Sequence, residues 1–253
     1  MRCLIVACAL VPALAMDSAH SPARAAEDSS IAEMFSSTIT LTSDYRFRGH
    51  SQTDRRAAVQ GGIDFAHPSG LFAGVWASSI NFNDPQNSPV ELDFTAGYSH
   101  EFSEDTAGSI AAAYYSYPSS EPAHYEYFEI VGTLSHDLGG FAVNSEFTYS
   151  PDYSGRTGIG VGLSGGVEIP IAIGDIDWLS ASGHAGRQWI EDNLAYGTPD
   201  WMFYDFGLTA TWNIFAFDVR YTATDLDKEE CFGGTNVCGN AVVWSVTLNL
   251  PFP

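Results

Sequence analysis

The feature that most constrains the fold is an alternation of apolar and polar residues that recurs along the chain. In the stretch STITLTSDYRFRG at 37–49, Ile39, Leu41, Tyr45 and Phe47 share one parity, and threonine, aspartate and arginine occupy the other. Because successive side chains of a β-strand point to opposite faces, this pattern predicts a strand with one apolar and one polar face. In a soluble β-protein the apolar face turns inward, whereas in an outer-membrane barrel it meets lipid.

Similar patterns predict eleven further strands and therefore an even total of twelve. Clear alternation occurs at 59–65, 91–99, 127–134, 141–149, 159–167, 204–213, 217–222 and 242–252, and weaker runs occur at 71–80, 107–117 and 178–189. Long polar connections alternate with tight turns, a sorting that is typical of outer-membrane barrels with both termini on the short-turn side. We therefore expect an all-β, antiparallel transmembrane β-barrel of about 12 strands, with long extracellular loops and short periplasmic turns.

Aromatic residues gather toward both ends of these predicted strands, and the strand middles are aliphatic. The long-loop ends carry Tyr45, Phe47, Tyr115, Tyr117, Tyr125, Tyr127, Tyr149, Trp189, Trp201, Tyr204 and Tyr221. The short-turn ends carry Phe65, Phe72, Phe102, Phe141, Trp212, Phe215, Phe217 and Phe252. Two aromatic belts around an aliphatic waist suit the two interfaces of a bilayer. The apolar face is therefore expected to point outward.

The N-terminus has the features of an export signal. Arg2 precedes a short apolar run, and an A-x-A cleavage site occurs at 23–25. We expect residues 1–25 to be a cleaved signal peptide, 26–36 a short periplasmic segment and 37–253 the barrel. A lipoprotein signal ending at Cys8 is the alternative, but Cys8 comes too early to leave an apolar core before it. The expected location is the outer membrane of a Gram-negative bacterium.

The charge balance restricts the partners of the chain. There are 10 basic and 31 acidic residues, giving a formal net charge of −21, which argues against nucleic acid as a ligand. The expected partners are outer-membrane lipid and lipopolysaccharide, small hydrophilic solutes, and the barrel-assembly machinery. The C-terminal WSVTLNLPFP, with its near-terminal Phe252, resembles the insertion signal that this machinery reads.

Two cysteines remain once the predicted signal peptide, with Cys3 and Cys8, is removed. Cys231 and Cys238 bracket FGGTNV, and in an oxidising compartment such a pair forms a local disulfide. A metal site would need two further ligands nearby, and none occurs at a recognisable spacing. We therefore expect a disulfide and no metal site.

The polar parity of the strands is strongly charged, and an apolar core would not tolerate it. The candidate lumen-lining residues are Asp44, Arg46, Arg48, Gln60, Asp64, Glu91, Asp93, Glu129, Glu146, Asp205, Asp218 and Arg220. They are compatible with a channel lining or with a salt-bridged network that plugs a narrow barrel, since twelve strands lie between filled and open barrels. Because carboxylates outnumber arginines, a conducting lumen is expected to prefer cations.

Two catalytic-type motifs overlap in a glycine-rich strand. Gly162–Gly166 matches G-x-S-x-G and Gly160–Gly165 matches G-x-G-x-x-G, but both motifs require a following helix that the pattern does not predict. His184 shares a strand with Ser180 and Ser182, and we interpret it as a polar lumen residue. No catalytic residue and no cofactor are predicted.

Four blocks, SDYRFRG at 43–49, VQGGIDF at 59–65, SGLFAGVWASSINF at 69–82 and ELDFTAGYS at 91–99, resemble the TorF-type porin family. These are proteobacterial outer-membrane proteins of unknown function. The resemblance is densest over 37–117. It implies an outer-membrane barrel that passes small solutes, and it carries no substrate or catalytic residues.

The predicted function is a monomeric, narrow, cation-preferring outer-membrane channel for passive diffusion of small hydrophilic solutes. A non-conducting structural or partner-binding barrel is the main alternative. A membrane-embedded enzyme and a secreted soluble barrel that binds an apolar ligand are the others.

Overall fold

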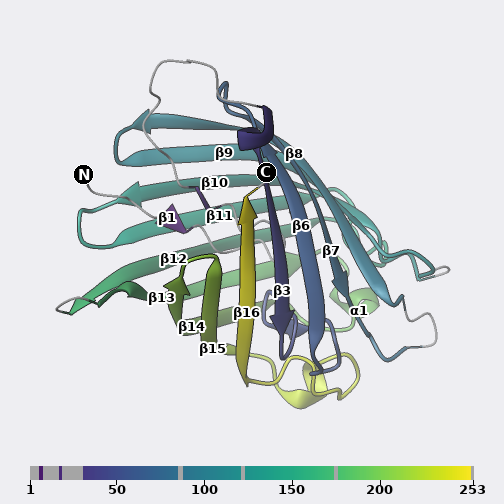
Figure 1. The fold of residues 1–253 in the computed structure, drawn as a ribbon. Helices are drawn as coiled ribbons and strands as arrows, with labels where there is room; N and C mark the ends of the chain where they lie inside the picture. The colour runs from purple at the N-terminus through teal and green to yellow at the C-terminus, as the bar shows by residue number, and fades with distance from the viewer. Residues whose placement is uncertain are drawn as a thin grey trace.

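Twelve antiparallel strands close into a single barrel, as the alternation predicts (Figure 1). The computed structural model describes residues 31–84, 88–120, 123–173 and 176–251, together with two short paired strands, β1 (Val6–Ala7) and β2 (Asp17–Ser18). Each barrel strand pairs with its neighbours along the chain, and β16 pairs with β3 to close the ring. Most of the predicted signal peptide, and Phe252, lie outside the described residues.

The strands agree closely with the predicted runs. They are β3 (Phe35–Thr42), β6 (Ala58–Ala66), β7 (Leu71–Ser79), β8 (Val90–Ser103), β9 (Thr106–Ser116), β10 (Tyr127–Asp137), β11 (Ala142–Ser150), β12 (Gly160–Ile173), β13 (Ile176–Ile190), β14 (Trp201–Trp212), β15 (Phe215–Thr224) and β16 (Ala241–Pro251). Within the described residues, helical structure is limited to η1 (Ile31–Met34), α1 (Asn193–Tyr196) and η2 (Lys228–Glu230). No helix in the described ranges is long and apolar enough to cross a membrane.

The barrel is apolar outside and polar inside, the reverse of a soluble barrel. Large apolar side chains such as Val75, Leu163 and Phe206 are about half exposed on the outer face. Glu129 and Gln188, by contrast, are fully buried within the barrel. An outer face of this kind is stable against hydrocarbon, while backbone groups are satisfied by the closed ring of strand pairs.

The first predicted strand is wrong beyond Thr42. Alternation continues in the sequence to Arg48, but the chain leaves the wall and forms a small hairpin of β4 (Arg46–Phe47) and β5 (His50–Ser51). Arg48 and Gly49 form its tight turn with φ of 46° and 84°, the left-handed pair that a two-residue hairpin of type I′ requires. The residues of this short hairpin show the same apolar–polar alternation as a longer wall strand. Alternation alone therefore does not distinguish a hairpin from a continuation of β3.

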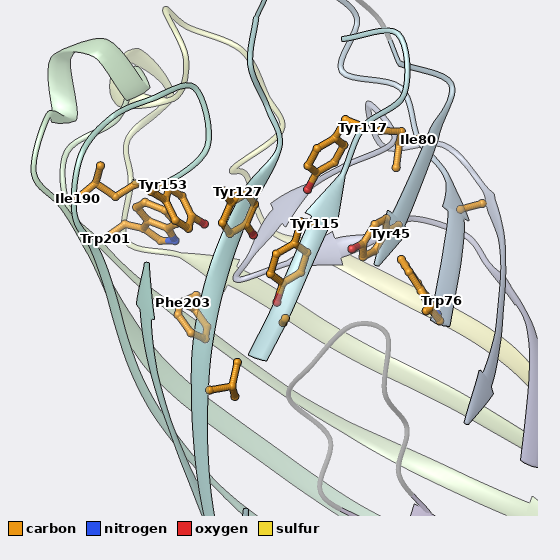
Figure 2. Packing of buried hydrophobic residues seen from close by; sticks show 13 residues of the cluster. Tyr45, Trp76, Ile80, Tyr115, Tyr117, Tyr127, Tyr153, Ile190, Trp201 and Phe203 are labelled. Carbon is orange, nitrogen blue, oxygen red and sulfur yellow. The ribbon is translucent and has the colours of Figure 1, made fainter. Parts of the chain in front are cut away.

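The long-loop aromatic belt is also partly wrong, because several of its rings point inward. Tyr45, Tyr115, Tyr117, Tyr127 and Trp201 are at most 7% exposed and form one internal cluster with Trp76, Tyr153, Phe203 and others (Figure 2). Phe72, assigned to the short-turn belt, is buried as well. Rings that remain exposed outside include Tyr149, Trp189 and Tyr204 at one end and Phe102, Phe141, Trp212 and Phe217 at the other. Position along a strand therefore did not determine the face on which a ring lies.

A lysine on the outer face should lower the free energy of unfolding far more than a lysine in the lumen. Val75→Lys, in the middle of β7, is expected to lower the free energy of unfolding in bilayers by about 2–4 kcal/mol, because the ammonium would lie in hydrocarbon. Thr38→Lys is the matched control, since Thr38 lines the internal cavity and its lysine can remain hydrated. Equal losses in urea titrations of both variants would contradict this orientation of the wall.

Candidate functional site

Residues 43–56, which we call the plug segment, fold into the barrel between β3 and β6. The segment lies over a cavity of about 340 Å³ and lines it through Asp44, Tyr45, Arg46, Arg48 and Gly49. The wall side of this cavity is formed by Thr38, Thr40, Thr42, Gln60, Trp76, Glu146, His184, Phe203, Tyr204, Asp205, Asp218, Arg220, Thr222, Val243, Ser245 and Thr247. The candidate site is therefore a polar lumen with an internal cover.

Arg48 fastens the plug segment to the opposite wall. Its two terminal nitrogens donate to the two carboxylate oxygens of Glu129 on β10, at 2.8 and 2.9 Å. The same guanidinium donates to Gln188 Oε1 at 2.9 Å and to Thr148 Oγ1 at 3.2 Å. In the closed strand order β11, which carries Thr148, lies opposite β3, so the plug segment carries Arg48 from its own side of the barrel to the far wall.

The Arg48–Glu129 pair is almost completely shielded from solvent. The side chains are 8% and 0% exposed. Burial acts to lower the pKa of Arg48, but the charge of Glu129 and the nearby tyrosines outweigh it and place the pKa well above its usual value. Arg48 is therefore charged, and its two parallel hydrogen bonds to Glu129 have the bidentate geometry that gives the strongest arginine–carboxyl contacts.

Asp44 fixes the shape of the plug segment from within. Its Oδ2 accepts from Arg46 Nε at 2.6 Å, and its Oδ1 accepts from the hydroxyls of Ser51 and Thr53 at 2.5 and 3.0 Å. Thr53 Oγ1 in turn accepts from the backbone N–H of Tyr45 at 3.2 Å. The segment is consequently an ordered unit with its own polar centre.

Aromatic contacts seal the segment against the inner wall. Tyr45 meets Trp76 of β7 edge-on at 5.4 Å between ring centroids, and Phe47 lies 5.9 Å from Tyr115 of β9. On the other side, Trp201 of β14 donates from Nε1 to the carbonyl of Arg48 at 2.9 Å. Since Trp201 is only 1% exposed, the long-loop half of the lumen is tightly filled.

A second charged group lines the cavity on the β13–β15 wall. Arg220 pairs with Asp205 and with Asp218, the latter at 3.1 Å. Asp205 Oδ1 also accepts from the ring Nδ1 of His184 at 2.9 Å. Arg220, the two aspartates and His184 therefore pair with one another, and the hydrogen bond to Asp205 holds the histidine in this network.

The other predicted lumen residues also lie on inward-facing strand positions. Gln60 donates to Ser78 Oγ at 3.2 Å, and Glu91 accepts from the Tyr117 hydroxyl at 2.8 Å. Asp64, Asp93 and Glu146 complete the set. None of Asp64, Glu91, Asp93 and Glu146 forms a salt bridge with an arginine in the described part of the chain.

Among the residues that receive the plug segment, the sequence indicates only Glu129 as lumen-lining. Thr148 and Gln188 are not among the predicted lumen residues, although their inward parity is a usable signal. Trp201 is predicted to lie in the long-loop aromatic belt and instead points inward. The two glycine motifs lie within β12, and the predicted disulfide between Cys231 and Cys238 is confirmed, with 5.9 Å between the Cα atoms.

Removing Arg48 should release the plug segment, because Glu129 would be left as an unpaired buried charge. For Arg48→Ala we expect a local loss of about 3–5 kcal/mol, seen as faster hydrogen exchange of the 43–56 amides. Arg56→Ala is the matched control in the same segment. The Arg56 side chain is 67% exposed in its pair with Asp54, so its loss should cost no more than about 1 kcal/mol. Unchanged protection in Arg48→Ala would refute this role.

Acid should loosen the plug segment through His50. Its ring is 3% exposed and stacks on Trp201 at 4.3 Å. Burial and then the charge of Arg46 lower the pKa of His50 to about 3. An opened segment has the usual histidine pKa of about 6.5. Protons therefore bind the open state preferentially, and stability present above about pH 6.5 falls progressively toward pH 3.

Hydrogen exchange of residues 43–56, corrected for the intrinsic effect of pH, measures this dependence. His50→Phe keeps a ring against Trp201 but cannot titrate, so its protection should change less between pH 7.5 and 4.5. His67→Phe, at an exposed histidine, should behave like the wild type. The assignment to His50 fails if His50→Phe retains the full pH response.

Comparison with known proteins gives the chain a family and its barrel a set of structural relatives. The model of Gcw_chp, a bacterial protein family of unknown function, matches residues 25–251. No curated protein matches the chain in sequence. The resemblance to TorF-type porins remains a prediction from the sequence.

Solved porin structures share the fold at low identity. The KdgM porin superposes with a TM-score of 0.56 and 9% identity, covering 86% of this chain and 99% of that one. The NanC porin gives a TM-score of 0.57 and 13% identity over 85% and 100% of the two chains. A KdgM porin structure in complex with disordered oligogalacturonate gives 0.55 and 7% over 85% and 99%. At these identities the likeness establishes the fold.

Proposed function

The chain belongs to the Gcw_chp family of bacterial proteins of unknown function, and we propose that it is an outer-membrane, porin-like channel for passive diffusion of small hydrophilic solutes or ions. The observation that carries the proposal is a cavity of about 340 Å³, lined by many polar and charged residues, inside a barrel whose outer face is apolar. In such a barrel the lumen is the route that a hydrophilic solute can take across a membrane. The shared fold with KdgM and NanC, both described as porins, supports this role by analogy.

The plug segment implies that passage is gated. Arg48, Trp201 and the tyrosine cluster fill the long-loop half of the lumen, so a solute needs the plug segment to move. The same contacts favour the main alternative, a non-conducting barrel, if the segment never leaves. A bilayer measurement distinguishes the two functions.

Cation preference follows from the uncompensated carboxylates. Arg46, Arg48 and Arg220 are engaged by Asp44, Glu129, Asp205 and Asp218. Asp64, Glu91, Asp93 and Glu146 are left without an arginine in the described residues, and each of them that is ionised adds negative charge to the lumen. Rings of carboxylates favour cations in other channels.

Planar-bilayer recording tests the channel. The wild-type barrel should show rare or small steps, and Arg48→Ala should show larger or more frequent ones because its plug segment is loosened. Arg56→Ala should match the wild type. Silence from all three variants, each verified as folded by heat-modifiable migration, would leave the structural barrel as the function.

Reversal potentials in a salt gradient test selectivity. The test variant combines Arg48→Ala, which opens the lumen, with Asp64→Asn, Asp93→Asn and Glu146→Gln. Its cation-to-anion permeability ratio should be several-fold lower than that of Arg48→Ala alone. Glu229→Gln, at an exposed site in η2, controls for net charge and should have no such effect. If this four-substitution variant had the same permeability ratio as Arg48→Ala alone, the lumen carboxylates would have no part in selectivity.

A further inference from the structure

The loop between β15 and β16 holds the plug segment from outside the strand ladder. Within it, residues 231–240, which we call the clasp loop, contain the disulfide of Cys231 and Cys238. Arg46 Nη1 donates to the carbonyls of Val237 and Gly239 at 3.0 and 2.8 Å. The backbone N–H of Ser51 donates to the carbonyl of Val237 at 2.9 Å.

A second arginine of the plug segment binds the same short stretch. Arg55 Nη1 donates to the carbonyls of Asn236 and Gly239, each at 3.1 Å, and its Nη2 donates to the carbonyl of Asn240 at 2.9 Å. All acceptors in this contact are backbone carbonyls of residues 236–240. Their positions depend on backbone conformation and not on side-chain identity.

The disulfide determines that conformation. Cys238 lies directly between Val237 and Gly239, and both cysteines are at most 2% exposed. Thr235 caps the loop by donating from its backbone N–H to the carbonyl of Cys231 at 2.8 Å, and Thr224 Oγ1 donates to the carbonyl of Cys238 at 2.9 Å. The stretch CFGGTNVCGN is rich in glycine and therefore flexible. Without the crosslink, fixing its carbonyls in the positions that bind Arg46 and Arg55 would have a larger cost in conformational entropy.

The clasp loop also contributes an apolar contact to the plug segment. Phe232 meets the ring of His50 edge-on at 5.4 Å, while His50 stacks on Trp201 on its other side. The clasp loop therefore contacts β4, β5 and Arg55 together. By contrast, the wall pairing of β15 with β16 begins at Thr222 and Ala241, beyond the crosslinked residues.

We propose that the disulfide-closed loop is a clasp that keeps the lumen covered: it orders the carbonyls that bind Arg46 and Arg55, and its loss frees the plug segment while the barrel wall stays intact. This inference rests on the proposed channel function for its consequence, but its structural part is independent. Opening would then require the clasp to yield as well as the Arg48–Glu129 pair.

The decisive variant replaces both cysteines, Cys231→Ser with Cys238→Ser. Hydrogen exchange of residues 43–56 should accelerate at least tenfold, whereas the amides of the β15–β16 ladder and the heat-modifiable migration should not change. Open-channel events should become several-fold more frequent. Arg55→Ala, with the disulfide intact, should free the same amides in part, and Arg56→Ala should leave them protected.

The outcomes separate the clasp from the channel. Wild-type protection of residues 43–56 in the double serine variant would overturn the clasp, even if Arg48→Ala conducts. Accelerated exchange in the double serine variant, with no conductance from it or from Arg48→Ala, would support the clasp and overturn the channel. Should the double serine variant not fold, unchanged protection in Arg55→Ala overturns the clasp, and faster exchange supports it.

Discussion

An apolar outer wall excludes most charged side chains from the outward strand positions and places them in the interior, and the rest of this structure follows from that constraint. Charges inside a twelve-stranded barrel are tolerable when water or a counter-charge reaches them. Here the wall supplies mainly carboxylates, and the plug segment supplies arginines. The pairing of Arg48 with Glu129 therefore serves two purposes at once, because it neutralises a buried wall charge and fastens the internal cover.

The architecture was predictable because its rule is local. Clear alternation places nine of the twelve strands and strand composition the other three, and the short turns and the disulfide follow from residue types at fixed spacing. Partners across the lumen were not predictable, because parity tells which face a side chain occupies and not what it meets there. Arg48 and Glu129 are 81 residues apart in sequence. The inward rings show the same limit, since Tyr115 and Trp201 were placed by their position along a strand and not by their parity.

The error at 43–49 is informative about the motif itself. SDYRFRG was interpreted as the end of a wall strand, and it carried the resemblance to TorF-type porins. In the structure its residues form the internal cover, with Asp44 organising the segment and Arg48 reaching across it. A stretch with several charged residues can therefore continue the apolar–polar alternation of a strand and still belong to a loop. The Arg48-Gly49 turn was the local signal that distinguished the two.

The contacts of the plug segment also set an order of assembly. The residues that receive Arg46 and Arg48, or donate to them, lie 81, 140, 153 and 191 positions further along the chain. Closing loops of this size carries an entropic cost that only a formed wall can offset. The cover is consequently complete only when β10, β13, β14 and the β15–β16 loop are all in place. A chain that ends before the β15–β16 loop would form most of the wall but would lack the carbonyls that bind Arg46 and Arg55.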